Sequence, residues 1–437
     1  MTDALRAALG ATLRESPIDI TGRVVAAGAA SLRAIVPGAA IGDVCLVERA
    51  AGPLRAEVVG FDEDAVILLP SERLDGVRPG ATVTTAPRLG TAPDALAAAG
   101  LVLDPLGRRL DNGAPVPMSD APLRAAPPNP LRRARIAAPF HTGLRVLDGM
   151  LPLGVGQRVG LFAGSGVGKS TLLAQLVRGC DADAVVVALV GERGREVREF
   201  LDDALRPDVR ARTTVVVATA DAAPALRIRA VLLATALAEQ HRARGAHCAL
   251  FVDSVTRYAR ALREAALLAG EPPARRGFPA SVFAELPAVF ERAGTAEQGA
   301  ITGIYTVLVE GGDLEEPVAD EVRGIVDGHV VLDRRLAERG HFPAVDVLSS
   351  VSRVAGAVAD PHALADATAV RRALARLHEH RDAIDLGIYR RGTDAALDQA
   401  IAARADIDAF LQQPPDDACP AAHTRDQLAD LAFRLGP

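Results

Sequence analysis

The sequence predicts a multidomain protein: an N-terminal β-barrel, a central α/β domain with a mostly parallel sheet, and a C-terminal α-helical domain. Short β-rich runs follow one another over residues 18–88, separated by Gly and Pro as in small closed barrels. Apolar strand-like runs then alternate with helical patterns over residues 146–358, and such alternation builds a parallel sheet covered by helices. Residues 359–437 are dominated by Ala, Leu and Arg in a helical pattern.

Two further segments flank and connect these domains. Leu5, Leu9 and Leu13 recur every four residues, which predicts an amphipathic helix within residues 1–17. This helix is interpreted either as a loosely attached terminal element or as an oligomerisation segment. Residues 89–145 are rich in Pro, Gly and Arg, and we interpret them as a linker that crosses onto the central domain.

The composition argues against a membrane-spanning or nucleic-acid-binding protein. The chain has no Trp and 3% aromatic residues, whereas proteins that bind single strands stack bases on aromatic side chains. Its formal net charge of −6 disfavours binding to nucleic acid or to an anionic membrane. No apolar run has the length of a transmembrane helix, and the first residues lack the pattern of a signal peptide. The four cysteines are far apart, which predicts reduced thiols in a cytosolic protein.

One basic residue differs from all the others. Lys169 is the single lysine among 49 basic residues, and every other one is arginine. Ordinary surface positions accept either side chain. A lysine that persists alone therefore indicates a place where a compact ammonium on a flexible stem is needed. We expect a functional site at Lys169.

Lys169 lies in a glycine-rich segment with the phosphate-loop pattern, in which Ala163 replaces the usual first glycine. A predicted buried strand precedes the segment and a predicted helix follows it, as this motif requires. Glycines let backbone N–H groups converge on phosphate oxygens, and the helix N-terminus favours negative charge. In such loops the lysine reaches the β- and γ-phosphates, while the hydroxyl of Ser170 ligates Mg²⁺. The predicted nucleotide-binding residues are Gly164, Ser165, Gly166, Val167, Gly168, Lys169, Ser170 and Thr171.

Two carboxylates end further predicted strands of the central domain. Asp253 follows an apolar strand, as the Mg²⁺-binding acid of such a site does, although many buried strands end in an Asp that only caps them. Glu192 ends a second strand, where α/β sheets hold ligands, and there it can polarise an attacking water. Its competing role is that of a helix N-terminal acid paired with arginines. The residues alone leave both roles open.

Five motifs, in order along the chain, resemble the type III secretion ATPases, relatives of the catalytic subunit of rotary ATP synthases. The resemblance spans about residues 20–411 and implies that the central domain is a RecA-like P-loop ATPase. It also implies that the cofactors are ATP and Mg²⁺. The motifs occupy residues 160–170, 191–196, 253–261, 270–279 and 327–332.

The resemblance implies roles for the acids and for Arg193. Glu192 corresponds to the catalytic carboxylate, and Arg193 to a basic group near the γ-phosphate. Lys169 corresponds to the lysine that binds the phosphates in these relatives. Asp253 corresponds to the acid that holds Mg²⁺ together with Ser170.

Three residues later in the chain complete the implied site. Arg257 matches an arginine just beyond the Mg²⁺-binding acid. Arg353 matches an arginine finger that enters the pocket of the neighbouring subunit and stabilises charge on the transferring phosphoryl group. Phe342 lies where relatives stack an aromatic ring on adenine, and its competing role is that of a core side chain.

Because the arginine finger comes from a neighbouring subunit, hydrolysis requires assembly, and the resemblance implies a homohexameric ring. The implied partners are a cytoplasmic stator or regulator protein, a central stalk protein, export-gate proteins, and secreted substrates with their chaperones. No nucleic acid is expected. The implied location is cytoplasmic, at the inner face of the cytoplasmic membrane and bound there only through partners.

Within this family we interpret the chain as an ATPase that energises type III export, and the phosphate-loop sequence favours the flagellar version. Residues 318–323 and 346–348 are closer to the injectisome version, which is the competing interpretation. Less favoured are an ATP synthase catalytic subunit, a non-hydrolysing ring subunit and a hexameric RNA translocase. Glu192 argues against a non-hydrolysing subunit, because such subunits lack that carboxylate.

Overall fold

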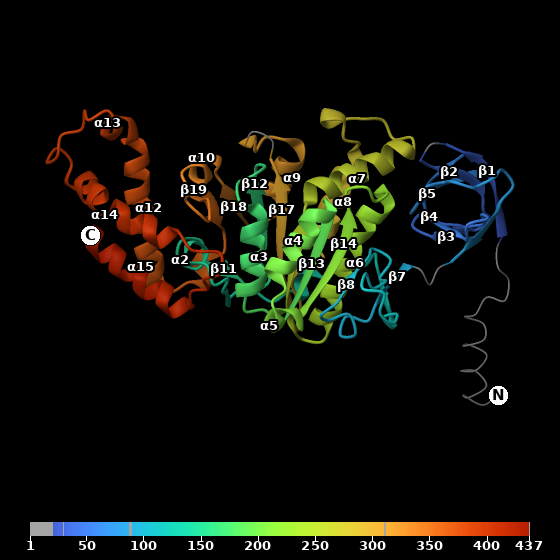
Figure 1. Cartoon of the computed structure of the whole chain (residues 1–437), viewed down its shortest axis with the longest axis horizontal. Coiled ribbons are helices and arrows are strands. Elements are labelled where there is room, and N and C mark those ends of the chain that lie inside the picture. Colours follow the sequence, from blue (N-terminus) through green and yellow to red (C-terminus); the bar gives the residue numbers. More distant parts are fainter. Residues whose placement is uncertain (1–20, 29, 87–89, 310–311, 437) are drawn as a thin grey trace. The chain divides into compact units, whose positions relative to one another are not determined.

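The computed structural model describes residues 21–436 except for residues 29, 87–89 and 310–311 (Figure 1). The helix expected within residues 1–17 lies outside the described residues. The described residues form two compact units. One contains the barrel together with Ala222–Leu226 and Ala261–Pro279, and the other contains the remainder of the chain. None of the helices in the described part is both long and apolar enough to cross a bilayer.

The N-terminal β-barrel is confirmed. Its strands close in the order β1-β2-β5-β4-β3-β6, and all its pairings are antiparallel. Burial alternates along β1 and β4, because successive side chains point to opposite faces of a strand, and the inward ones fill the barrel core. The strands are β1 (Thr21–Ala27), β2 (Leu32–Ile35), β3 (Val44–Val47), β4 (Leu54–Asp62), β5 (Ala65–Pro70) and β6 (Thr82–Thr85).

The central α/β domain is confirmed as well. Within the described residues its sheet has nine strands, in the order β19-β18-β12-β17-β15-β13-β14-β8, with β16 paired to β17. All neighbours along this order are parallel except β18 and β19. The strands are β8 (Val102–Leu103), β12 (Arg158–Ala163), β13 (Ala184–Glu192), β14 (Thr213–Thr219), β15 (His247–Asp253), β16 (Gly294–Thr295), β17 (Ala300–Leu308), β18 (Gly328–Leu332) and β19 (Val345–Ser352).

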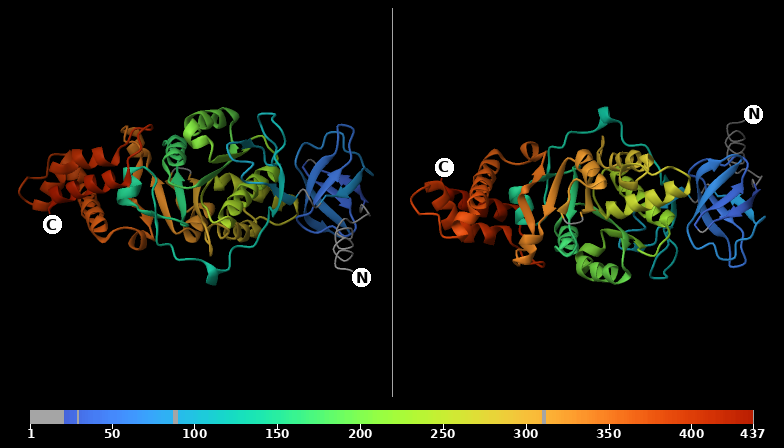
Figure 2. Two further views of the ribbon diagram at one scale, coloured as in Figure 1. Left: turned by 90° about the horizontal axis from the view of Figure 1, so that it is seen from below. Right: turned by 90° about the horizontal axis from the view of Figure 1, so that it is seen from above.

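Helices cover both faces of this sheet (Figure 2). The middle strands are therefore shielded from water on both sides, and all nine residues of β13 are buried. The helices are α2 (Arg145–Met150), α3 (Lys169–Gly179), α4 (Gly194–Ala204), α5 (Pro207–Arg210), α6 (Pro224–Ala243), α7 (Val255–Leu268), α8 (Ala280–Phe290), α9 (Pro317–Ile325), α10 (Arg334–Glu338) and α11 (Ala355–Val358).

The segment expected to be a linker, residues 89–145, also contributes a strand to the sheet of the central domain. Its strand β8 pairs in parallel with β14 and extends the sheet by one strand. A two-residue strand is too short to show a hydrophobic period, so the sequence pattern did not indicate it. Two small two-stranded sheets accompany it, made of β7 (Thr91–Pro93) with β9 (Met118–Pro122) and of β10 (Pro139–Phe140) with β11 (Leu153–Gly154).

The C-terminal region is helical, as expected. Asp360 and Asp394 cap the first turns of α12 and α14, and their side chains accept hydrogen bonds from backbone N–H groups of those turns. Arg145 joins this bundle to α2, because its Nε donates to the carbonyl of Phe410 at 3.0 Å. The helices are α12 (Pro361–Glu379), α13 (Arg381–Asp385), α14 (Ala395–Leu411) and α15 (Ala421–Leu435).

Candidate functional site

The phosphate-loop pattern forms the turn between β12 and α3. The strand ends at Ala163, the loop follows, and the helix begins at Lys169. Gly168 precedes the helix with a φ of +89°, which only glycine adopts without strain. Val167 is buried and anchors the loop, whereas Ser165, Gly166, Ser170 and Thr171 are exposed, which leaves them accessible to a ligand.

The ammonium of Lys169 lies between two carboxylates. Its Nζ donates to both carboxylate oxygens of Asp253 and lies 3.4 Å from Oε1 of Glu192. All three side chains are nearly buried, and buried charges of this kind are stable only when paired. The lysine that the composition singled out is thus held by the two acids that the strand ends predicted.

The sheet order explains this meeting. The strands β12, β17, β15 and β13 are consecutive neighbours and run parallel, so their carboxyl ends lie along one edge. The loop with Lys169 follows β12, Asp253 ends β15 and Glu192 ends β13. Ligands of open α/β sheets bind outside such an edge.

Thr306 is a site residue that the sequence reasoning missed. It lies on β17, between the strands of the phosphate loop and of Asp253, and its Oγ1 donates to Oδ1 of Asp253 at 2.6 Å. This hydrogen bond fixes the orientation of the carboxylate. A threonine near the carboxyl end of a mostly apolar strand was the only signal in the sequence.

Arg257 contacts the carboxylate oxygen of Glu192 that Lys169 does not approach. Its Nη1 lies 3.0 Å from Oε2 of Glu192 and also donates to the carbonyl of Gly191. Gly191 has a φ of +72°, and a Cβ there would lie 2.7 Å from Cδ of Arg257, so any larger residue would displace the arginine. Burial, followed by the charge of Asp253, raises the pKa of Glu192, while Lys169 and Arg257 oppose this change.

Arg193 does not join this cluster. It precedes α4 as the N-cap residue, and its side chain is 77% exposed, with its Nη1 3.9 Å from Glu196. Phe342, in contrast, lies against the phosphate loop. A Cβ built on Gly168 would be 3.3 Å from Cε1 of its ring, and the side chain is 43% exposed, which does not fit a core residue.

Arg353 lies at the amino ends of the parallel strands, whereas the phosphate loop lies at their carboxyl ends. It follows β19, whose last residue pairs with Gly328 at the amino end of β18, and β18 runs parallel to β12. The six residues of β12 span about 20 Å between the two edges. The Nη1 of Arg353 donates to the carbonyl of Val326 at 3.2 Å. The arginine therefore does not contribute to the site of its own chain.

A second missed residue touches the loop itself. Arg334, the first residue of α10, donates from Nη2 to the carbonyl of Ser165 at 3.2 Å. In a chain with so many arginines, no spacing distinguishes it.

The described residues contain no group of three or more His, Cys, Asp or Glu side chains arranged to hold a metal. The two residues predicted to hold Mg²⁺, Ser170 and Asp253, offer a hydroxyl and a carboxylate. This small donor set suits Mg²⁺, which is usually bound through one or two protein oxygens together with substrate phosphates and waters.

Comparison with known proteins identifies relatives that match more than nine-tenths of the chain. Residues 143–352 match the model of the ATP synthase alpha/beta family, nucleotide-binding domain, and residues 359–430 match the T3SS EscN ATPase C-terminal domain. A flagellum-specific ATP synthase of Pseudomonas aeruginosa is 44% identical and covers 94% of this chain and 93% of its own length. A type 3 secretion system ATPase of Sinorhizobium fredii is 45% identical, covering 91% and 89%.

A solved structure is similar over nearly the same span. The assembled ATPase EscN in complex with its central stalk EscO, from the type III secretion system of enteropathogenic E. coli, has a TM-score of 0.86 at 41% identity. The match covers 94% of this chain and 100% of that chain.

Proposed function

The chain belongs to the family of type III secretion ATPases, relatives of the ATP synthase α and β subunits, and we propose that it hydrolyses Mg-ATP to energise protein export through a type III apparatus. The observation that carries this proposal is the single lysine of the chain, paired with Glu192 and Asp253 where a phosphate loop begins its helix.

Each group at this edge has a defined task in hydrolysis. Backbone N–H groups of the phosphate loop bind the triphosphate, and Lys169 leaves its carboxylate partners for the β- and γ-phosphates. Ser170 and Asp253 hold the Mg²⁺ of the substrate, with Thr306 orienting the carboxylate. Glu192 accepts a hydrogen bond from the attacking water and polarises it for in-line attack on the γ-phosphorus.

Two arginines are proposed to support Glu192. Arg257 contacts its carboxylate directly and holds it in place. Arg193 follows Glu192 in the chain, and its exposed side chain is free to approach the γ-phosphate.

The first test concerns Lys169. The Lys169→Ala and Lys169→Arg variants are expected to bind a fluorescent ATP analogue roughly 10- to 100-fold more weakly, because a charge-assisted contact to the phosphates is lost or misplaced. The turnover rate should fall together with this affinity. Arg372→Lys, a change at an exposed position of α12, is the control and should leave both quantities unaltered. Full turnover in Lys169→Arg would contradict the proposal.

The second test uses the pKa of Glu192. A base must be deprotonated, so kcat/KM should decline as the pH falls through the raised pKa of this carboxyl. Arg257 lowers that pKa, so Arg257→Gln is expected to move the decline to higher pH. Arg260→Gln, on the same helix α7, is the control. A pH profile that Arg257→Gln leaves in place would show that another group limits the rate.

We propose that the working form is a homohexameric ring. The solved relative is described as assembled and bound to its central stalk. In this chain Arg353 and the phosphate loop lie at opposite edges of one sheet, so each subunit offers a nucleotide site at one edge and an arginine at the other. Head-to-tail contacts that close into a ring bring such halves together. A central stalk protein is the first expected partner, followed by a stator, export-gate proteins and substrates with their chaperones.

Phe342 completes the proposed nucleotide site. Its exposed ring lies next to Gly168, at the start of α3, where an adenine can stack on it.

Flagellar and injectisome relatives are 44% and 45% identical to this chain, so the choice between the two rests on the phosphate-loop sequence, which favours the flagellar apparatus. Deletion of the gene is then expected to abolish motility and leave effector secretion intact; the reverse result would assign the chain to an injectisome.

A further inference from the structure

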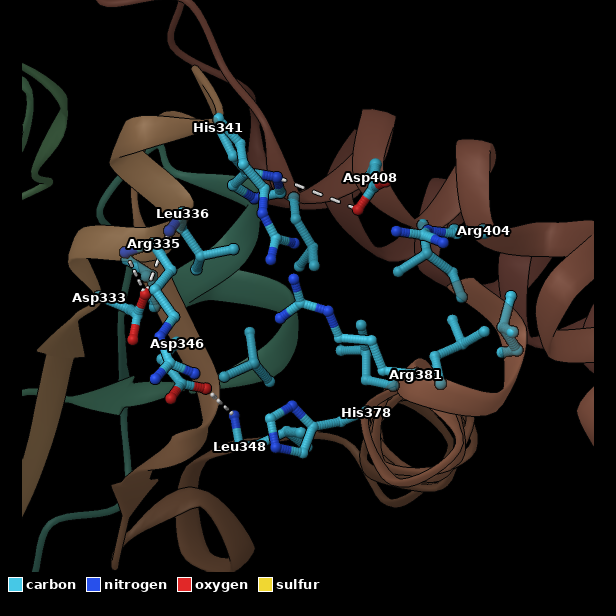
Figure 3. A pocket seen from close by; sticks show the side chains of 18 of the residues that line it. Asp333, Arg335, Leu336, His341, Asp346, Leu348, His378, Arg381, Arg404 and Asp408 are labelled. Atoms are coloured by element: carbon cyan, nitrogen blue, oxygen red, sulfur yellow. Dashed lines mark hydrogen bonds and ion pairs between the residues drawn. The ribbon is translucent and has the colours of Figure 1, made fainter. Parts of the chain in front are cut away.

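A cavity of about 200 Å³ separates α10 and β19 from the helices α12, α13 and α14 (Figure 3). Its apolar surface comes from both sides and includes Leu336, Val345, Leu374 and Ile407. An apolar cavity of roughly 150 Å³ admits benzene, so this one can hold a body of about six to eight carbons. No residue of the proposed ATPase site lines it.

Arginine side chains around this cavity have unused donors. Arg335, Arg339 and Arg404 line it, and none of them has a side-chain hydrogen bond or ion pair to another described residue. Arg381 extends from α13 toward the facing wall, and its Nε donates to Asp385 at 3.4 Å (Figure 3). Unpaired guanidinium groups beside an apolar surface can bind a carboxylate or a phosphate.

Four acids line the cavity, and two of them accept hydrogen bonds from nearby backbone N–H groups. Asp333 accepts two backbone N–H groups as the N-cap of α10. Asp346 accepts hydrogen bonds from the backbone of Leu348 and from Ser349. Of the other two, Asp385 pairs with Arg381 and Asp408 faces Nδ1 of His341, so Arg335, Arg339 and Arg404 have no carboxylate partner among the described residues.

A buried ring nitrogen also lacks a partner there. His341 lines the cavity and is 8% exposed, and its Nε2 has no hydrogen-bond partner among the described residues. Its Nδ1 faces Asp408 at 4.0 Å. A buried polar atom without a partner costs free energy, and a polar atom of a ligand would remove that cost.

One short segment connects the cavity with the phosphate loop. Leu336 of α10 faces the cavity, whereas Arg334 of the same helix donates to the carbonyl of Ser165. His341 faces the cavity, and the next residue, Phe342, lies against Gly168. A ligand that shifts α10 therefore changes the position of the loop.

We propose that this cavity binds a small amphipathic anion, an apolar body of about six to eight carbons with a carboxylate or phosphate head, and that its occupancy alters ATP affinity through Arg334 and Phe342. The coupling rests on the proposed ATPase function, whereas the binding does not.

Calorimetry with the full chain, without nucleotide, tests the binding. Octanoate and octyl phosphate represent the two anionic head groups on an apolar body. The control 1-octanol has the same apolar body without a charge, and inorganic phosphate has the charged head group without an apolar body. Saturable binding is expected for octanoate, octyl phosphate or both, with 1-octanol and inorganic phosphate at least about tenfold weaker. Absence of binding by both anions, or equal binding of 1-octanol or inorganic phosphate, would overturn the proposal.

Two variants locate the site. Arg381→Gln should weaken binding of the anion about tenfold or more, whereas Arg372→Gln, a change on α12 away from the cavity, should not. Equal effects of the two changes would show that the anion binds elsewhere.

The coupling is measured separately. The bound anion should change the KM for ATP about fivefold, and Arg334→Gln should abolish this response while the anion still binds. An unchanged KM in the unaltered protein with the anion bound would refute the coupling alone. A protein that binds the anion and does not hydrolyse ATP would refute the proposed function and leave the site standing.

Discussion

Arg353→Ala is expected to reduce kcat by roughly 10³- to 10⁵-fold while ATP still binds, because an arginine finger acts only on the charge of the transition state. The side chain lies at the sheet edge remote from Lys169 of its own chain, so its effect depends on a neighbour. The measurements are steady-state turnover and binding of a fluorescent ATP analogue. In the unaltered protein, turnover per subunit should rise with protein concentration through the range in which the ring assembles.

A mixing experiment separates action on a neighbour from action within one chain. Arg353→Ala and Lys169→Ala subunits are each inactive, but in a mixed ring roughly a quarter of the interfaces pair an intact Lys169 with an intact Arg353. Turnover should therefore return on mixing. If the mixture is as inactive as its components, Arg353 does not serve a neighbouring site.

Glu192→Gln is expected to lower kcat by roughly 10²- to 10⁴-fold, the range typical of a missing general base. The amide keeps the shape of the side chain and removes its charge. ATP should bind at least as tightly, because one of the two carboxylates that face the triphosphate becomes neutral. Glu199→Gln on α4 is the matched control, since that exposed carboxylate pairs with Arg195 at 2.6 Å. Turnover in Glu192→Gln near that of the control would assign the base to another residue.

The parts of the site that the sequence predicted are those carried by local pattern. The phosphate loop joins residues adjacent in the chain, and Asp253 and Glu192 end apolar runs long enough to be recognised as strands. Because parallel strands end at one edge, the predicted strands imply that the acids and Lys169 lie at the same edge. The residues alone left two roles open for Glu192, and the resemblance to a known family favoured that of the catalytic carboxylate.

The remainder depends on contacts between distant segments. Thr306 contacts Asp253 only because β17 lies beside β15. The hydrophobic pattern of a strand does not show which strands become its neighbours in the sheet. Arg334 reaches Ser165 across 169 residues of sequence, from a helix of five residues. The strand β8 is two residues long, and β19 reverses direction at the sheet edge. None of these features has a local signature.

The ion pairs around Lys169 also have a consequence for the form of the nucleotide that is expected to bind. Lys169 and Arg257 balance Asp253 and Glu192, so these four groups carry no net formal charge. A bare triphosphate would have to withdraw the ammonium from Asp253 and would then face the uncompensated carboxylate of that residue at close range. A triphosphate that arrives with its divalent ion supplies the compensating charge itself. We therefore expect the protein to bind ATP that carries a divalent ion more tightly than ATP in the presence of a chelator.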